Sequence, residues 1–201
     1  LPSTLKTIKT NAFSKSQITT INIPAGIDDI YDGAFAQIEN LTAITVDAGN
    51  SKYTAADGIL YENKGGNKYL KAYPVAKTGT TFTVPNDVYG VSTNGFQQAK
   101  NLTTINLPAS IQDLPTTKEA NGFTSATNLT AIKVAAGNTK FKDEDGVVLT
   151  KDGKTLVAYP FARQGVANAA YNVTDPTKPA GKVYTIPASV ETIGKGAFAK
   201  A

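Results

Sequence analysis

The chain has 201 residues, of which 41% are hydrophobic and 18% charged, with a formal net charge of +4. This balance predicts a folded chain with a sizeable apolar core, because disordered chains have fewer apolar residues and more net charge. The sequence has no His and no Cys, which excludes the usual zinc and iron–sulfur sites and the side chain best suited to proton transfer near neutral pH.

Lysine supplies nearly all of the positive charge, since Arg163 is the only arginine. Bidentate contacts to bases and phosphates favour arginine, and the lysines are scattered along the chain, so the sequence predicts no nucleic-acid partner. No stretch approaches the roughly 20 apolar residues of a membrane span, so no membrane insertion is expected.

One short sequence pattern recurs from the first residues of the chain to the last. Each of five copies has two aliphatic residues three positions apart, then a small residue followed by Phe. In four copies an aliphatic-x-x-Ile-x-aliphatic segment follows, and the unit is about 23 residues long, as from Ile23 to Val46. The small–Phe steps are Ala12-Phe13, Ala34-Phe35, Gly95-Phe96, Gly122-Phe123 and Ala197-Phe198. We expect these Phe rings to stack as a structural column.

The spacing of the copies predicts one solenoid domain over residues 1–201, because a single coil cannot bury its apolar face alone. The fourth copy contains an expansion at 115–118. Two longer segments separate the copies and are expected as insertions. The repeats lie near 1–23, 24–46, 85–107, 108–134 and 187–201, and the insertions span 47–84 and 135–186.

The Ile-x-aliphatic segments read as short strands that end at a following Pro or turn. Alternation along each strand directs Ile21, Ile44, Ile105 and Ile132 inward, together with the aliphatic residue two positions later. The residues between them face outward. The sequence therefore predicts one exposed polar row, formed by Asn22, Thr45, Asn106, Lys133 and Thr185.

The two insertions are copies of one unit, because Ala48-Gly49-Asn50 and Asp57-Gly58 recur 88 residues later as Ala136-Gly137-Asn138 and Asp145-Gly146. Each insertion reads as a β-hairpin that returns to the repeats through Tyr-Pro. The first turn is expected at Gly65-Gly66-Asn67 and the second at Asp152-Gly153. The stretch 164–182 is expected to be an irregular loop.

The segment from Ile23 to Val46 resembles the BspA-type leucine-rich repeat, with Ile27, Ile30, Ala34-Phe35, Leu41 and Ile44 at the matching positions. The resemblance covers almost the whole chain, apart from 164–182. It implies a curved right-handed solenoid, rich in short β-strands, with irregular or 3₁₀ turns. It also implies a bacterial cell-surface or secreted protein, with no shared catalytic motif. Since the chain starts inside a repeat and ends just after Phe198, we expect it to be a fragment of a longer protein.

Several other groups are candidate sites. The acidic run 143–145 with Gly146 has carboxylates but not the ligand spacing of a calcium loop, so a solvated turn is expected and no metal. Asp28 and Asp29 are adjacent rather than facing across a cleft, as glycoside hydrolysis needs. Tyrosines of the insertions could stack on sugar rings, or pack across strands instead. These are Tyr53, Tyr61, Tyr69, Tyr73 and Tyr159.

These observations favour a non-enzymatic interaction module without a cofactor. The first hypothesis is adhesion to an extracellular host or bacterial protein through the exposed strand row or the hairpins. A carbohydrate-binding module, based on the tyrosines, is the second. The third is a structural spacer that presents another domain.

Overall fold

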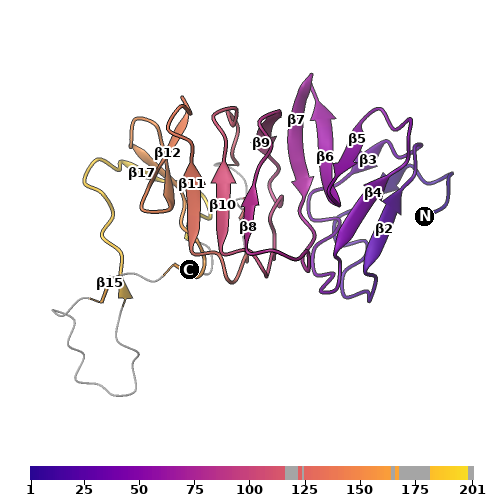
Figure 1. Ribbon diagram of the computed structural model, residues 1–201, viewed down its shortest axis with the longest axis horizontal. Helices are drawn as coiled ribbons and strands as arrows, with labels where there is room; N and C mark the ends of the chain where they lie inside the picture. The colour runs from indigo at the N-terminus through magenta and orange to yellow at the C-terminus, as the bar shows by residue number, and fades with distance from the viewer. Residues whose placement is uncertain (116–121, 124, 164–165, 168–181, 199–201) are drawn as a thin grey trace, which may run out of the picture.

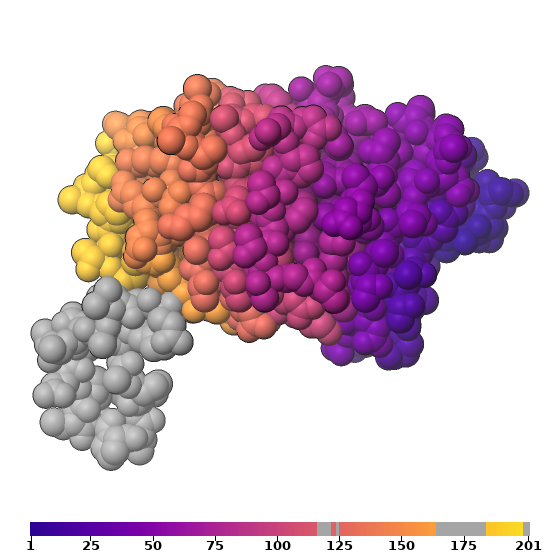
Figure 2. Space-filling view, in the orientation of Figure 1, coloured from indigo at the N-terminus to yellow at the C-terminus, as the bar shows by residue number. Residues whose placement is uncertain are grey.

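The computed structural model describes residues 1–115, 122–123, 125–163, 166–167 and 182–198. All regular structure in these residues is β-strand, and no helix occurs there that could cross a membrane. The coils stack in chain order along the long axis (Figures 1 and 2). The chain is therefore a β-solenoid, as the sequence predicts.

One side of the solenoid carries short strands that pair in parallel from coil to coil. Strand β2 (Thr20–Ile23) pairs with β4 (Ala43–Val46), and β10 (Thr104–Leu107) lies between β8 (Thr81–Thr83) and β11 (Ala131–Val134). The predicted alternation is confirmed, because Ile21, Ile44, Ile105 and Ile132 are all buried. Strand β8 lies within 47–84, the range that the sequence assigned to an insertion.

A second side carries another set of parallel pairs. Strand β1 (Thr7–Ile8) pairs with β3 (Asp29–Ile30), β7 (Asn67–Ala72) with β9 (Val88–Val91), and β14 (Thr155–Ala158) with β17 (Thr192–Ile193). Turns close the third side of each coil and carry the small–Phe steps. Gly95 and Gly122 fit close contacts there, since a Cβ on either would lie within 2.8 Å of Val91 Cγ1.

Each insertion is a three-stranded antiparallel unit rather than a simple hairpin. Strands β5 (Tyr53–Ala56) and β6 (Ile59–Lys64) precede β7 in the first, and β12 (Phe141–Glu144) and β13 (Val147–Thr150) precede β14 in the second. The two expected hairpins are confirmed, β6–β7 and β13–β14. The extra strands β5 and β12 precede turns at Asp57-Gly58 and Asp145-Gly146 that hold both residues at positive φ. Such Asp-Gly pairs are typical of two-residue hairpin turns, a signal that the sequence analysis did not use.

The stretch 164–182, expected as a loop, falls largely outside the described residues. Its ends pair as two short antiparallel strands, β15 (Val166–Ala167) and β16 (Lys182–Val183). The expansion expected at 115–118 is described only at Pro115.

The inserted hairpins divide the interior into three cores. In β6, Leu60 belongs to the N-terminal core, whereas its neighbours Ile59 and Tyr61 belong to the central core. In β13, Val147 belongs to the C-terminal core and Val148 to the central one. These strands are thus apolar on both faces, which explains their continuous apolar runs where a half-exposed strand would alternate.

The aromatic column follows the same division and is not continuous. Phe13 stacks on Phe35 with ring centroids 6.1 Å apart in the N-terminal core. In the central core Phe96 stacks on Phe123 at 5.6 Å, and Tyr73 lies 5.6 Å from Phe96 on its other side. Tyr159 stacks on Phe198 at 4.9 Å near the C-terminal end. The tyrosine of each Tyr-Pro step therefore continues the aromatic column in place of a repeat phenylalanine.

An asparagine fixes the start of each insertion to the preceding coil. Asn138, with 1% of its surface exposed, donates through Nδ2 to the carbonyl oxygens of Pro108 and Ile111, at 3.1 and 2.8 Å. Its Oδ1 accepts from the backbone N–H groups of Lys140 and Phe141, both at 2.8 Å. Asn50 makes the corresponding four contacts in the first insertion. A buried amide is stable here because all of these donors and acceptors are satisfied.

The Asp-Gly turns of the two insertions cover the strand edges of β4 and β11 that pair with no parallel strand among the residues that the structure describes. The carbonyl oxygen of Gly58 accepts from the N–H of Ile44, and that of Gly146 accepts from the N–H of Ile132. An ideal Cβ on Gly146 would lie 2.8 Å from the Cβ of Ala131. Glycine is therefore required at this turn by the close approach as well as by its positive φ.

We predict that Gly146→Ala lowers the free energy of unfolding more than Gly66→Ala does, as measured by urea denaturation. Gly146 has φ +83° and Gly66 has φ +80°. Alanine is disfavoured in this left-handed region by about 1–2 kcal/mol, so both variants incur that cost. Gly66 has no atom within 4 Å of its ideal Cβ, whereas the contact at Gly146 should add roughly 1–3 kcal/mol. Equal losses in the two variants would contradict the close approach of this turn to β11.

Candidate functional site

The predicted polar row is split into two groups on the first parallel side. Asn22 lies beside Thr45 across β2 and β4, and Asn106 lies beside Lys133 across β10 and β11. The first insertion stands between these groups, where β6 and β7 are seen in Figure 1. Thr185 does not extend the row: it is exposed, but it follows β16 and belongs to no strand. Its local sequence matched the repeat, but β16 pairs with β15 instead of joining the solenoid sheet.

Hydrogen bonds connect the side chains of the row across the strands. Thr45 Oγ1 donates to Asn22 Oδ1 at 2.8 Å, and Asn22 Nδ2 donates to Asp47 Oδ1 at 2.8 Å. In the other group Asn106 Nδ2 donates to Thr83 Oγ1 at 3.1 Å. Thr83 and Asp47 are members that the sequence analysis missed. The alternation around Phe82 and the closing Pro85 could have identified Thr83 as part of a strand.

Lys133 differs from the rest of the row because it carries a positive charge, and about half of its side chain is exposed. Its Nζ lies 3.3 Å from Asp143 Oδ2. Asp143 also accepts from the backbone N–H groups of Val134 at 2.7 Å and Gly146 at 3.1 Å. Asp143 is therefore fixed by the edge of β11, while Lys133 keeps part of its ammonium group available to solvent or a partner. A half-exposed ion pair of this kind contributes little to stability.

The acidic run 143–145 holds no arrangement suited to calcium, because each carboxylate contacts protein groups. Glu144 pairs with Lys142 at 2.9 Å, and Asp145 pairs with Arg163. The Arg163 guanidinium beside Asp145, through its hydrogen bond and its charge, lowers the pKa of that carboxyl. In the described residues no group of three or more metal-binding side chains comes together.

Asp28 and Asp29 do not form a carboxylate pair for glycoside hydrolysis. Asp28 pairs with Lys6 at 3.7 Å, and Asp29 pairs with Lys52 at 3.2 Å. Each carboxylate thus has its own lysine, and the arrangement does not supply two carboxyls that face one substrate position.

The insertion tyrosines are mainly structural. Tyr53, Tyr61 and Tyr73 are buried, and the hydroxyl of Tyr53 accepts a hydrogen bond from the N–H of Ile30 at 2.8 Å. Tyr159 is half-buried in the aromatic column, and Tyr69 is half-buried on the second parallel side. Most of the rings that motivated a carbohydrate-binding module are therefore not available for stacking on a sugar.

The repeat pattern and the fold can be compared with those of known protein families and solved structures. The family profile described as the BspA type leucine rich repeat region matches residues 1–57 and 72–144, in six copies. The chain belongs to this family. The sequence predicts five copies, and the fifth, near 187–201, lies outside the matched residues. The second match begins at residue 72, just before the segment that forms β8.

Two solved bacterial structures share the fold of this family member. A leucine rich cell surface protein from Faecalibacterium prausnitzii is 21% identical with a TM-score of 0.54, over 96% of this chain and 52% of that one. A leucine-rich repeat protein from Eubacterium ventriosum is 22% identical with a TM-score of 0.54, over 100% of this chain and 63% of that one. The chain thus spans between half and two thirds of their length. Comparison with curated proteins gave no match.

We predict that the buried tyrosines ionise only near the pH at which the protein unfolds. Burial, the largest cause, raises the pKa values of Tyr53, Tyr61 and Tyr73 to about 12. In the unfolded chain the tyrosine pKa has its ordinary value of about 10. Between pH 10 and pH 12 the folded state therefore binds more protons than the unfolded state. The free energy of unfolding should fall as the pH rises through this range. A spectrophotometric tyrosine titration, run with circular dichroism, measures both events. Smooth titration of all nine tyrosines near pH 10 in the folded protein would show that the rings are exposed.

Proposed function

We propose that this chain is a non-catalytic interaction module of a bacterial cell-surface or secreted protein, and that it binds an extracellular protein. The polar row carries the proposal. Its side chains lie on regularly paired strands and point away from the core, so they can change without loss of the fold. Stacked repeats commonly use such extended faces for binding, and leucine-rich-repeat solenoids are generally non-catalytic.

The group formed by Thr83, Asn106 and Lys133 is the part of the row that we propose to make the contact. These residues come from three adjacent strands, and Lys133 adds a charge that a partner carboxylate can pair with. The Faecalibacterium protein, described as a cell surface protein, supports an extracellular location. A glycan partner is less well supported, because the row has no aromatic side chain to stack on a sugar ring.

A binding screen against extracellular matrix proteins and bacterial surface proteins tests this proposal, with a glycan array in parallel. We expect a saturable protein partner whose affinity falls at least about tenfold in Lys133→Gln. This change removes the charge without placing a second carboxylate against Asp143. The matched control is Lys9→Gln, an exposed lysine next to β1, which should leave the affinity unchanged.

Absence of any protein partner at micromolar concentration would contradict the proposal and favour a structural spacer. A hit on the glycan array alone would instead favour the carbohydrate-binding alternative. Equal effects of the two lysine variants on a protein partner would remove the polar row as the contact surface.

A further inference from the structure

The second parallel side contains a cleft at the junction between the N-terminal coils and the first insertion. Strands β1 and β3 form one sheet there, and β5, β6, β7 and β9 form another. Among the described residues, no strand pairing joins β3 to the second sheet. Instead, the Tyr53 hydroxyl accepts a hydrogen bond from the N–H of Ile30. The two sheets separate at this point and leave a cleft of about 460 Å³. We call it the junction cleft.

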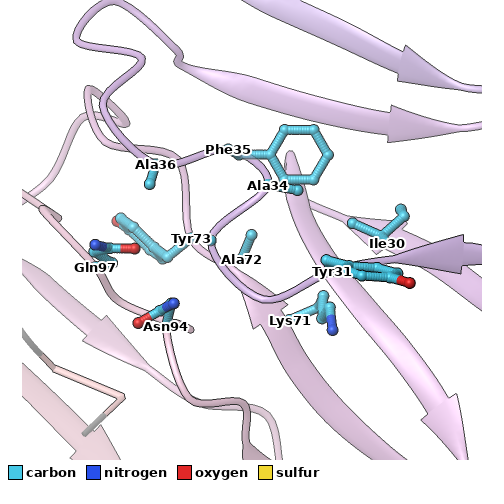
Figure 3. A pocket seen from close by; sticks show the side chains of 11 residues that line it. Ile30, Tyr31, Ala34, Phe35, Ala36, Lys71, Ala72, Tyr73, Asn94 and Gln97 are labelled. Atoms are coloured by element: carbon cyan, nitrogen blue, oxygen red, sulfur yellow. The ribbon is translucent and has the colours of Figure 1, made fainter. Parts of the chain in front are cut away.

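The walls and floor of the junction cleft come from different parts of the chain. Asp29, Tyr31 and Asp32 line it on one side, and Tyr69, Ser92, Thr93 and Asp113 line it on the other, with Glu62 and Lys71 also contributing. A smaller cavity of about 20 Å³ adjoins it and shares Ile30, Tyr31 and Lys71. Figure 3 shows Tyr31 and Lys71 together at one end of this smaller cavity, and Asn94 and Gln97 near Tyr73 at the other.

A network of ion pairs holds Lys71 in place. Lys71 Nζ lies 2.8 Å from Asp32 Oδ1 and 3.2 Å from Glu62 Oε2, and only 8% of the lysine side chain is exposed. Burial opposes the charge on Lys71, but the hydrogen bond to Asp32 and the charges of Asp32 and Glu62 outweigh it and raise the pKa of the ammonium. Lys52 pairs in the same way with Asp29 and Glu62. Three of the four carboxylates in the cleft are therefore paired with two lysines of the chain itself, which share Glu62.

Asp113 is the exception among these carboxylates. It is exposed, and within the described part of the chain it forms no ion pair. Its side chain instead accepts a hydrogen bond from the hydroxyl of Tyr69. Burial, followed by the charge and hydrogen bond of Asp113, raises the pKa of Tyr69 to about 12, so the hydroxyl keeps its proton and remains a donor. An uncompensated negative charge is thus fixed beside an aromatic ring.

The ring of Tyr69 is itself held rigidly. A Cβ on Gly90 would lie 2.7 Å from Tyr69 Cε1 and 2.7 Å from the carbonyl oxygen of Asp113, so the ring lies directly against the backbone of β9. Tyr89 packs against it edge-on, with centroids 5.8 Å apart. On the other wall of the cleft, Tyr31 leaves 45% of its surface exposed. Binding to the pre-positioned ring of Tyr69 costs little conformational entropy.

We infer that the junction cleft binds a cationic side chain, arginine or lysine, presented by a protein partner. A guanidinium or ammonium group in the cleft would pair with Asp113 and lie against the rings of Tyr31 and Tyr69, as cations do over aromatic faces. The cleft lining has four carboxylates and two lysines, although the chain as a whole is positive, with a net charge of +4. That the cation belongs to a protein rests on the proposed function, whereas recognition of the cation itself does not.

The test is an NMR titration of the intact chain with blocked Gly-Arg-Gly and, as a neutral control of the same shape, blocked Gly-citrulline-Gly. We expect saturable shifts around Tyr31, Tyr69 and Asp113 with the arginine peptide, and no saturation with the citrulline peptide. Raising the salt concentration should weaken the binding. The titration needs no protein partner, so its result is independent of the screen for the polar row.

Two variants locate the binding group. Asp113→Asn keeps an acceptor for the Tyr69 hydroxyl and removes the charge, so it should weaken arginine-peptide binding at least about tenfold. Asp28→Asn removes an exposed carboxylate outside the cleft lining and should change nothing. Equal binding of the arginine and citrulline peptides, absence of shifts at the cleft, or equal behaviour of the two variants would each overturn the inference.

Discussion

No coil of this chain can cover its own apolar face, and the structure depends on how each coil is covered by its neighbour. Between repeats, parallel strands place like side chains over one another, and isoleucine and phenylalanine rows fill the interior. At the two insertions the packing is different, because one strand of each hairpin packs against a core on both of its faces. Leu60 completes the N-terminal core while Ile59 completes the central one. The hairpins therefore separate adjacent cores of the solenoid and are not surface additions to it.

The two insertions share a framework but have diverged at their surfaces. Both use a buried asparagine, an Asp-Gly turn and a Tyr-Pro return. A basic residue near the return pairs with the aspartate of each turn, Lys77 with Asp57 at 3.1 Å and Arg163 with Asp145. Asp143, which fixes the edge of β11, corresponds to Ala55 in the first insertion. Stability thus resides in the shared framework, and the proposed binding groups lie where the copies differ or where the sheets separate.

Local patterns in the sequence were sufficient for the solenoid, the buried rows and both hairpins, because each depends on alternation or turn chemistry within a few residues. The sequence carries the same kind of local signal for β5, β8 and β12, in the Asp-Gly pairs and in the alternation around Phe82. Thr185 was misplaced because a matching segment does not specify which strand it pairs with. The junction cleft could not be predicted, since Tyr31 and Asp113 are far apart in the chain and line one cleft only where the two sheets separate.

The role of the insertions as shared walls is tested most directly by amide hydrogen exchange in Leu60→Ala and Ile59→Ala. Each residue is fully buried, so each truncation should cost about 2–5 kcal/mol. If β6 separates two cores, Leu60→Ala should reduce the protection of β2 and β4 more than that of β10 and β11, and Ile59→Ala should do the reverse. The same set of weakened amides in both variants would contradict the division of the interior by the inserted hairpin.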